Sequence, residues 1–333
     1  MERIEKLRRK KNAFIIAHNL QRPEVVEIAD AVGGSTEIIR ATVETSADII
    51  VACGMDFMVE AVAVLNPDKK VLFPDRGAMC PMAHQLSRAD VRKAKKQHPG
   101  AEVLLYMNSL AESQALADCI CASENAIKMA ETMESDSPII FGPDRGLEHY
   151  ITRRTSKAII PIINYGICPM HHQIVPEDLI KGREAHPGAK IVAHPECSPE
   201  VQDLVDYIGS TSDIIKYCKN AMEEEFLLAS EVGLIHLIEK AAPDKKVYPV
   251  SPTAVCPQMK MITLAKIEAA LENERPAVVV PREIAVNARV PLERMFELSR
   301  CSFCAGHLPI TAPNATMQER IEGNVPAQAL CHS

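Results

Sequence analysis

Three cysteines, each followed by proline, recur at a constant interval. Cys80, Cys168 and Cys256 are separated by 88 residues each time. A fixed period indicates that one structural unit is used repeatedly, and here the unit is domain-sized and used three times. Three thiolates brought to one point could bind an iron–sulfur cluster. Such a cluster would keep one iron open, and an open iron acts as a Lewis acid on hydroxyl or carbonyl oxygens.

Two other interpretations of these cysteines stay open. Zinc could be bound by the three thiolates together with His171 or His172. Alternatively, the cysteines could be inert buried residues, which is the usual role of a single cysteine. The shared register and the proline after each cysteine favour a metal centre over inert residues.

Polar residues at the same interval follow three predicted strands. Each of three equivalent apolar runs predicts a buried strand that leads into a polar segment. The runs are residues 14–17, 102–105 and 190–193, and the polar segments contain His18, Tyr106, Met107, Asn108, His194, Pro195 and Glu196. Because ligands bind beyond the carboxyl ends of parallel strands, these residues are candidates for a binding site. If the units pack around a pseudo-threefold axis, the strand ends and the three cysteines converge on one cavity.

Two helices are predicted between the first and second strands of a unit. The apolar residues of 25–32 recur with helical spacing, and those of 201–208 repeat the pattern. Ser35, Ser123 and Thr211 lie at equivalent positions and are predicted to be N-caps of the next helices. Three helix N-termini are thus expected at matching places in the three units.

Strand and helix alternate throughout the chain. This pattern predicts an α/β fold of three pseudo-threefold-related, three-layer αβα units with small parallel sheets around a central site. The predicted units are residues 1–97, with an N-terminal helix, 98–185 and 186–298, followed by a C-terminal extension over residues 299–333.

The extension contains Cys301, Cys304 and Cys331, and a single C-x-x-C pair is a weak indication of a second metal or redox site. The remaining cysteines lack threefold partners and are expected to be small buried residues. They are Cys53, Cys119, Cys121, Cys197 and Cys218.

Composition narrows the class of protein. The 333 residues, 47% of them hydrophobic, can bury the core of two or three domains. The net charge of −7 and the lack of basic runs argue against nucleic acid as a partner. The charged N-terminus and the lack of a long apolar run predict a cytoplasmic protein with no membrane partner. Eleven cysteines in such a chain favour metal or redox chemistry over disulfides.

Seven motifs spread over about residues 10 to 298 form a specific joint pattern. They are Ala17-His18-Asn19-Leu20-Gln21-Arg22-Pro23-Glu24-Val25, Asn66-Pro67-Asp68-Lys69-Lys70, Tyr106-Met107-Asn108-Ser109, Phe141-Gly142-Pro143-Asp144, His194-Pro195-Glu196-Cys197, Gly209-Ser210-Thr211-Ser212 and Met259-Lys260-Met261-Ile262-Thr263. Together they resemble the quinolinate synthase, or NadA, family of de novo NAD biosynthesis.

The resemblance implies a fold, a cofactor and a reaction. Members of the family are triangular assemblies of three αβα units around a [4Fe-4S] cluster, whose ligands would here be Cys80, Cys168 and Cys256. They condense iminoaspartate with dihydroxyacetone phosphate to quinolinate and release phosphate and water. An aspartate oxidase or dehydrogenase would supply the iminoaspartate.

The resemblance also implies roles for individual residues. The implied catalytic residues are His18, Tyr106, His171, His194 and Glu196. The implied substrate-binding residues are His18, Ser35, Tyr106, Met107, Asn108, Ser123, His194, Pro195, Glu196 and Thr211. Glu196, His194 and His171 are suited to carry protons through imine and enol steps.

Two positions depart from the family pattern. Leu20 stands where the family usually has a tyrosine that is thought to transfer protons, and leucine has no hydroxyl group. Gly34 replaces a more usual acidic residue. The alternatives are therefore a paralogous [4Fe-4S] dehydratase or condensing enzyme on a related substrate, or a non-catalytic iron–sulfur sensor. A zinc hydrolase is disfavoured because the chain has no H-E-x-x-H motif.

Overall fold

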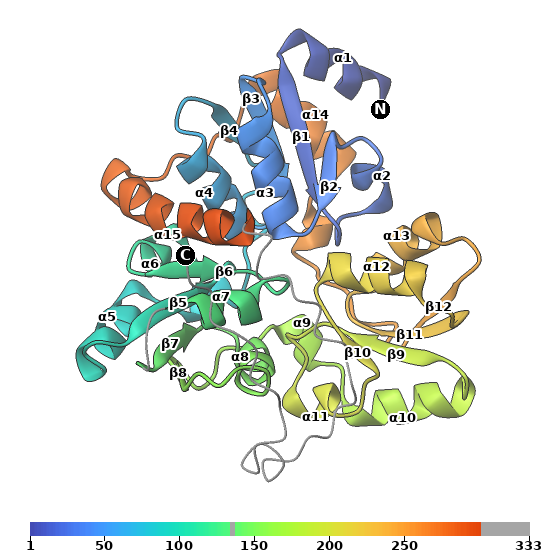
Figure 1. Ribbon diagram of the computed structural model, residues 1–333. Helices are drawn as coiled ribbons and strands as arrows, with labels where there is room; N and C mark the ends of the chain where they lie inside the picture. The colour runs from blue at the N-terminus through green and yellow to red at the C-terminus, as the bar shows by residue number, and fades with distance from the viewer. Residues whose placement is uncertain (134–136, 301–333) are drawn as a thin grey trace, which may run out of the picture. The chain divides into compact units, whose positions relative to one another are not determined.

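Three parallel β-sheets of four strands each form the framework of the protein. The computed structural model describes residues 1–133 and 137–300, and the three sheets lie within these residues (Figure 1). The strand orders are β2-β1-β3-β4, β6-β5-β7-β8 and β10-β9-β11-β12, so the three sheets share one topology. The predicted fold class, three αβα units with small parallel sheets, is confirmed.

The elements follow the 88-residue period along the chain. The first repeat contains α1 (Glu2–Lys10), β1 (Ala13–His18), α2 (Pro23–Val26), β2 (Ala31–Gly33), α3 (Ser35–Glu44), β3 (Ile49–Cys53), α4 (Asp56–Leu65), β4 (Lys70–Leu72), η1 (Ala83–Gln85) and α5 (Arg88–Gln97). The second contains β5 (Glu102–Tyr106), α6 (Ala111–Gln114), β6 (Cys119–Cys121), α7 (Ala126–Thr132), β7 (Ile139–Gly142), α8 (Arg145–Thr152), β8 (Ile159–Pro161), α9 (Pro169–His172) and α10 (Pro176–Ala185). The third contains β9 (Lys190–Ala193), α11 (Pro199–Gln202), β10 (Tyr207–Ile208), α12 (Thr211–Asn220), β11 (Glu225–Ala229), α13 (Leu234–Ala241), β12 (Lys246–Pro249), η2 (Met259–Met261), α14 (Leu264–Asn273) and α15 (Arg282–Arg300).

The inner strands are buried on both faces. Every residue of β3 and β7 is buried, and so is all of β11 except its first residue. Helices cover both faces of a parallel sheet of this kind, so its strands are continuous apolar runs instead of alternating ones. This is why the strands could be located from the sequence.

The helix that follows the first strand is shorter than predicted in the first and third repeats. α2 and α11 end early, and the second half of each predicted span forms an edge strand, β2 or β10. Asp30 is the cause in the first repeat, because its backbone N–H donates to the Ile15 carbonyl and its Oδ2 accepts the Ile15 N–H, both at 2.8 Å. Asp118 and Asp206 bond in the same way to β5 and β9.

The predicted N-caps are wrong by one residue or more. Ser35 and Thr211 are the first helical residues of α3 and α12, because Gly34 and Ser210 are the caps with extended backbone. In the second repeat α7 begins only after its cap, Asn125. Ser123 therefore lies in the turn before that helix.

The last two helices pack outside the third sheet. α14 contacts α1 and β3 of the first repeat, while α15 lies against α4 and against α6 and β6 of the second repeat (Figure 1). Ala277, between α14 and α15, also forms a bridge to Leu72 at the end of β4. The final segment of the described chain thus ties the first two repeats together.

Among the described residues no helix is long and apolar enough to cross a membrane. The five cysteines expected to be small buried residues are all buried and free, namely Cys53, Cys119, Cys121, Cys197 and Cys218. Cys301, Cys304 and Cys331, and with them the predicted redox site of the extension, lie outside the described residues.

Candidate functional site

A cavity of about 70 Å³ lies at the carboxyl ends of the central strands. His18 and Tyr106 end β1 and β5, and His194 directly follows β9, so all three repeats contribute equivalent residues. The predicted site residues that line the cavity are His18, Ser35, Cys80, Tyr106, Asn108, Ser123, Cys168, His171, His194, Glu196, Thr211 and Cys256. Met107 and Pro195 are buried but do not line it.

The three cysteine loops are joined in a ring by contacts between consecutive repeats. Gln85, which follows Cys80, donates to the Ile167 carbonyl at 3.3 Å and accepts the Ile167 N–H at 2.9 Å. Gln173 donates to the Thr253 carbonyl at 3.2 Å. The ring closes where η2 approaches Gly77, since a Cβ atom there would lie 2.5 Å from the methyl group of Met261. The three loops therefore enclose one side of the cavity.

The thiols of this ring are electrostatically unfavourable as thiolates. Burial raises the pKa of Cys80 and Cys168, and it raises that of Cys256 to about 11. Cys256 further raises the pKa of Cys80, and Cys80 that of Cys168, because the three sulfur atoms face the same space. A bound cation would reverse this preference, since metal ligation deprotonates a thiol. The donor set thus fits a metal centre.

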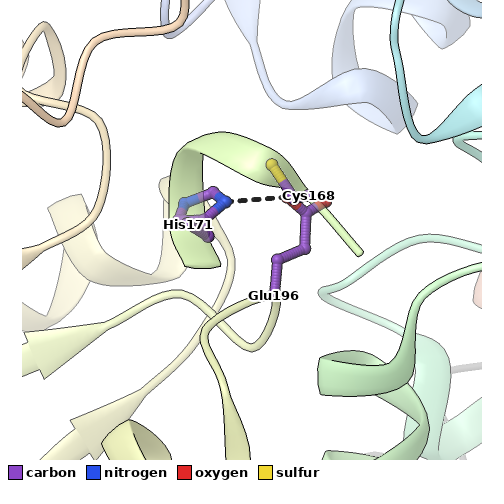
Figure 2. Close-up of side chains that lie close together, drawn as sticks. All are labelled: Cys168, His171 and Glu196. Carbon is purple, nitrogen blue, oxygen red and sulfur yellow. Dashed lines mark hydrogen bonds and ion pairs between the residues drawn. The ribbon is translucent and has the colours of Figure 1, made fainter. Parts of the chain in front are cut away.

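One compact group of possible metal ligands stands out among the described residues. Figure 2 shows Cys168 and His171 at the short helix α9, with Glu196 facing them from the loop after β9. The ligand atoms of these three residues all lie within 4.8 Å of one another. His171 Nδ1 and Glu196 Oε2 are 2.8 Å apart.

Cys80, Cys168 and Cys256 all line the cavity, and each is a free thiol.

Glu196 is the centre of a hydrogen-bond network inside the cavity. Its side chain is only 5% exposed, and it accepts hydrogen bonds from the Tyr106 hydroxyl at 2.7 Å and from Asn108 Nδ2 at 3.1 Å. Burial alone would raise its pKa, but His194 and the hydrogen bonds from His171 and Tyr106 outweigh burial and hold the pKa below its usual range. Glu196 is therefore a carboxylate at neutral pH, and its three hydrogen-bond partners, Tyr106, Asn108 and His171, all come from the second repeat.

Two histidines present N–H groups to the cavity. Burial lowers the pKa of His18 to about 4 and that of His194 to about 3, so both rings are neutral. Nδ1 of His18 accepts the backbone N–H of Leu20, and Nδ1 of His194 accepts that of Glu196, each at 3.2 Å. An accepting Nδ1 leaves the proton on Nε2. Each ring can thus donate one hydrogen bond to a bound ligand.

Glu124 is a lining residue that the sequence analysis missed. It accepts a hydrogen bond from Thr36 Oγ1, and burial raises its pKa. Its place directly after Ser123 could have indicated it. Methionine and phenylalanine side chains complete the lining, namely Met55, Phe57, Met58, Met82, Met170 and Met259. No lysine or arginine of the described residues lines the cavity.

Leu20 also lines the cavity, at the position equivalent to Asn108 and Glu196. Its side chain is 7% exposed, and its carbonyl accepts a hydrogen bond from Lys260 Nζ at 2.6 Å. Three equivalent positions thus carry an apolar group, an amide and a carboxylate. The first repeat supplies an apolar wall where the other two supply polar groups.

Comparison with known proteins gives a consistent result. Residues 2–297 match a family model described as quinolinate synthetase A protein. A quinolinate synthase of Methanosarcina barkeri is 46% identical over 295 residues, covering 89% of this chain and 96% of that protein. Quinolinate synthases of Pyrococcus furiosus and Methanocaldococcus jannaschii are 44% and 43% identical, covering 89% and 90% of this chain and 97% and 98% of those proteins.

Proposed function

The chain belongs to the quinolinate synthase family, as its motifs predicted, and we propose that it condenses iminoaspartate with dihydroxyacetone phosphate to form quinolinate for NAD biosynthesis. The observation that carries this proposal is one cavity lined both by the three equivalent cysteines and by the Glu196 network. The reaction needs anion binding, proton transfer and loss of water, and each can be traced to residues of the cavity.

The cofactor of this proposal is a [4Fe-4S] cluster held by Cys80, Cys168 and Cys256. The loop ring brings these thiols to one wall of the cavity, and no disulfide engages them. When bound, a cluster with three cysteine ligands supplies an open iron that acts as a Lewis acid toward a substrate oxygen. His171 and Glu196 lie beside the Cys168 ligand, where they can act on the same substrate atoms.

Both proposed substrates are anions, and the part of the lining formed by the described residues has no lysine or arginine to hold them. The available donors are the hydroxyls of Ser35, Ser123 and Thr211 and the Nε2–H groups of His18 and His194. Hydroxyl and N–H donors in a buried cavity bind carboxylate and phosphate oxygens through charge-assisted hydrogen bonds. Glu124 also lines the cavity, and burial raises its pKa.

Proton transfer is assigned to the Glu196 network. An imine becomes an enamine when a base removes the proton on the neighbouring carbon, and Glu196 is the carboxylate available for that step. Hydrogen bonds from Tyr106 and Asn108 fix one of its oxygens, while His171 holds the other. His194 stacks on His171 with ring centroids 4.6 Å apart. Because its Nδ1 accepts the backbone N–H of Glu196, its Nε2–H is available to stabilise a developing oxyanion.

Leu20 favours a second candidate, a paralogous cluster enzyme that dehydrates or condenses a related substrate. Its side chain forms an apolar part of the cavity wall in place of a hydroxyl. For quinolinate formation, every proton step must then be carried by Tyr106, His171, His194 or Glu196. We further propose that the reaction takes place in the cytoplasm. An aspartate oxidase or dehydrogenase would supply the unstable imine.

Anaerobic purification followed by metal analysis and turnover tests this proposal. We expect iron and sulfide in equal amounts, about four of each per chain, and quinolinate from iminoaspartate and dihydroxyacetone phosphate. Cys80→Ser, Cys168→Ser and Cys256→Ser should each abolish stable cluster binding, whereas the control Cys218→Ser changes a buried thiol outside the cavity. Zinc in place of iron, or full iron in a serine variant, would contradict the cofactor assignment. A loaded cluster without quinolinate would favour the paralogous reaction.

A further inference from the structure

An acidic side chain lies behind the cysteine loop of each repeat. In the first repeat Asp56 Oδ1 accepts the backbone N–H of Cys80 at 2.9 Å. In the third repeat Glu231 Oε1 accepts the N–H of Cys256 at 3.3 Å. Neither carboxylate lines the cavity, so neither is placed to contact substrate.

The second repeat has a related arrangement. Asp144 Oδ1 accepts the N–H of Leu147 at 2.6 Å, and the backbone N–H of Cys168 lowers the pKa of Asp144. Asp144 is fully buried, and its Oδ2 has no hydrogen-bond partner among the described residues. Cys80 and Cys256 thus donate their backbone N–H groups to a carboxylate, and Cys168 has the Asp144 carboxyl group near its own.

The three acidic residues occupy corresponding places in the fold. Each follows the second of the central strands, β3, β7 or β11, and stands at the beginning of the next helix. Asp56 and Asp144 are 88 residues apart, whereas Glu231 lies one residue short of that interval. The additional methylene of glutamate lets its carboxylate reach the cysteine loop from this displaced position.

The residue four positions after each cysteine completes the set. His84 Nε2 lies 2.6 Å from Asp56 Oδ2, and Lys260 Nζ lies 3.0 Å from Oε1 of the fully buried Glu231. In the second repeat the equivalent residue is His172, whose buried Nε2 has no hydrogen-bond partner in the described part of the chain. Two of the three carboxylates thus have a basic partner.

Lys260 links the third cysteine loop to the substrate cavity. Its Nζ donates hydrogen bonds both to Glu231 and, at 2.6 Å, to the carbonyl of Leu20 in the loop after β1. The third cysteine loop and the first polar loop of the cavity are therefore held by the same ammonium group. This contact joins residues that are 240 positions apart in the chain.

We propose that Asp56, Asp144 and Glu231 are positioning residues that fix the three cysteine loops before a metal centre binds. The argument rests on the cluster site assigned under the proposed function. A buried N–H group without an acceptor is unfavourable, so each carboxylate selects the loop conformation that turns the cysteine toward the cavity. The same residues also begin helices, and the experiment must separate that role from the positioning role.

Substitutions of Asp56 separate the two roles. Asp56→Ala removes both, while Asp56→Asn keeps an acceptor for Cys80 and an amide group beside His84. Asp56→Ser keeps a good residue for a helix start, but its hydroxyl is one bond too short to reach Cys80. Asp90→Ala is the matched control, because Asp90 belongs to the capping box of α5 and contacts no cysteine loop.

The readouts are alkylation of Cys80 in the folded full-length apoprotein, followed by mass spectrometry, and iron and sulfide per chain after anaerobic reconstitution. We expect alkylation about tenfold faster in Asp56→Ala and Asp56→Ser, the ratio that corresponds to one lost charge-assisted hydrogen bond. Both variants should also take up less iron. Asp56→Asn and Asp90→Ala should match the unmodified protein in both measurements.

Wild-type alkylation rates in folded Asp56→Ser would overturn the proposal and leave Asp56 with only its role as the first residue of α4. Faster alkylation in Asp90→Ala would also overturn it, because the effect would then be general loosening. Glu231→Gln and Glu231→Ala, with Cys256 as the reporter, repeat the test in the third repeat if Asp56→Ala does not fold. If the unmodified protein takes up no iron, the cofactor assignment fails, but the alkylation rates still decide the positioning role.

Discussion

Replacement of Glu196 tests whether the cavity depends on a charge or only on hydrogen bonds. Glu196→Ala leaves the Tyr106 hydroxyl, the Asn108 amide and His171 Nδ1 without their acceptor or partner. An unsatisfied buried polar group costs about 1–3 kcal/mol, so three would cost roughly 3–9 kcal/mol. Water can enter the adjoining cavity and satisfy part of this demand, which places the expected loss of unfolding free energy near the lower limit, about 3 kcal/mol.

Glu196→Gln is the matched variant, because it keeps the shape and most of the bonds. Its amide oxygen can accept from Tyr106 and Asn108, and its NH₂ group faces His171 Nδ1, while the other ring nitrogen of His171 lies 3.1 Å from Ser230 Oγ. We expect a loss of only about 1 kcal/mol. Catalysis should respond differently, since neither variant has a carboxylate to remove a proton, and both should lose about 10²–10⁴-fold in kcat.

The assay combines urea unfolding of the reduced apoprotein with quinolinate formation by the reconstituted protein. Working on the apoprotein separates the stability of the network from that of a metal centre. A Glu196→Ala protein as stable as Glu196→Gln would refute the inference that three buried donors depend on this carboxylate. Full turnover in Glu196→Gln would refute its assignment as the base.

Two further predictions concern pH and the first repeat. His18 and His194 are neutral in the fold because burial lowers their pKa to about 4 and about 3, while an unfolded chain protonates histidine near pH 6.5. Unfolding free energy should therefore be constant above pH 6.5 and fall toward pH 4 by up to about 1.4 kcal/mol per pH unit for each histidine. His18→Gln should remove its share of this slope in denaturant titrations, and an unchanged slope would contradict the assignment. Leu20→Tyr should raise quinolinate turnover toward the roughly 10²-fold that a positioned proton donor contributes, and a loss of turnover would favour the paralogous substrate.

The repeat made most of the fold predictable from the sequence. Strands that are buried on both faces are apolar runs, and the 88-residue interval located each of them three times. The edge strands were missed because their apolar residues also fit a helical period. What ends the helix is a pair of hydrogen bonds between Asp30 and Ile15, which lies 15 residues earlier in β1.

The same interval found some site residues and overlooked others. It located Cys80, Cys168 and Cys256 because each copy has the same residue type. Glu231 escaped, since it is displaced by one position and reaches Cys256 only through its longer side chain. Glu124 escaped because its partner Thr36, one period earlier, is a different residue type. Comparing residues 88 positions apart detects only positions that carry the same residue type. Contacts depend instead on how far each side chain reaches.

Some equivalent positions of the three repeats carry the same residue type, and others carry different ones. A cluster can be held by three equivalent thiols, so the cysteines keep their register and their residue type. Two different substrates cannot be bound by three equivalent pockets, and the positions after the central strands differ accordingly. His18 and His194 supply N–H donors, while Leu20, Asn108 and Glu196 supply an apolar wall, an amide and a base at equivalent positions. The scaffold thus keeps one residue type at the three equivalent cysteines and varies it at Leu20, Asn108 and Glu196, which line the same cavity.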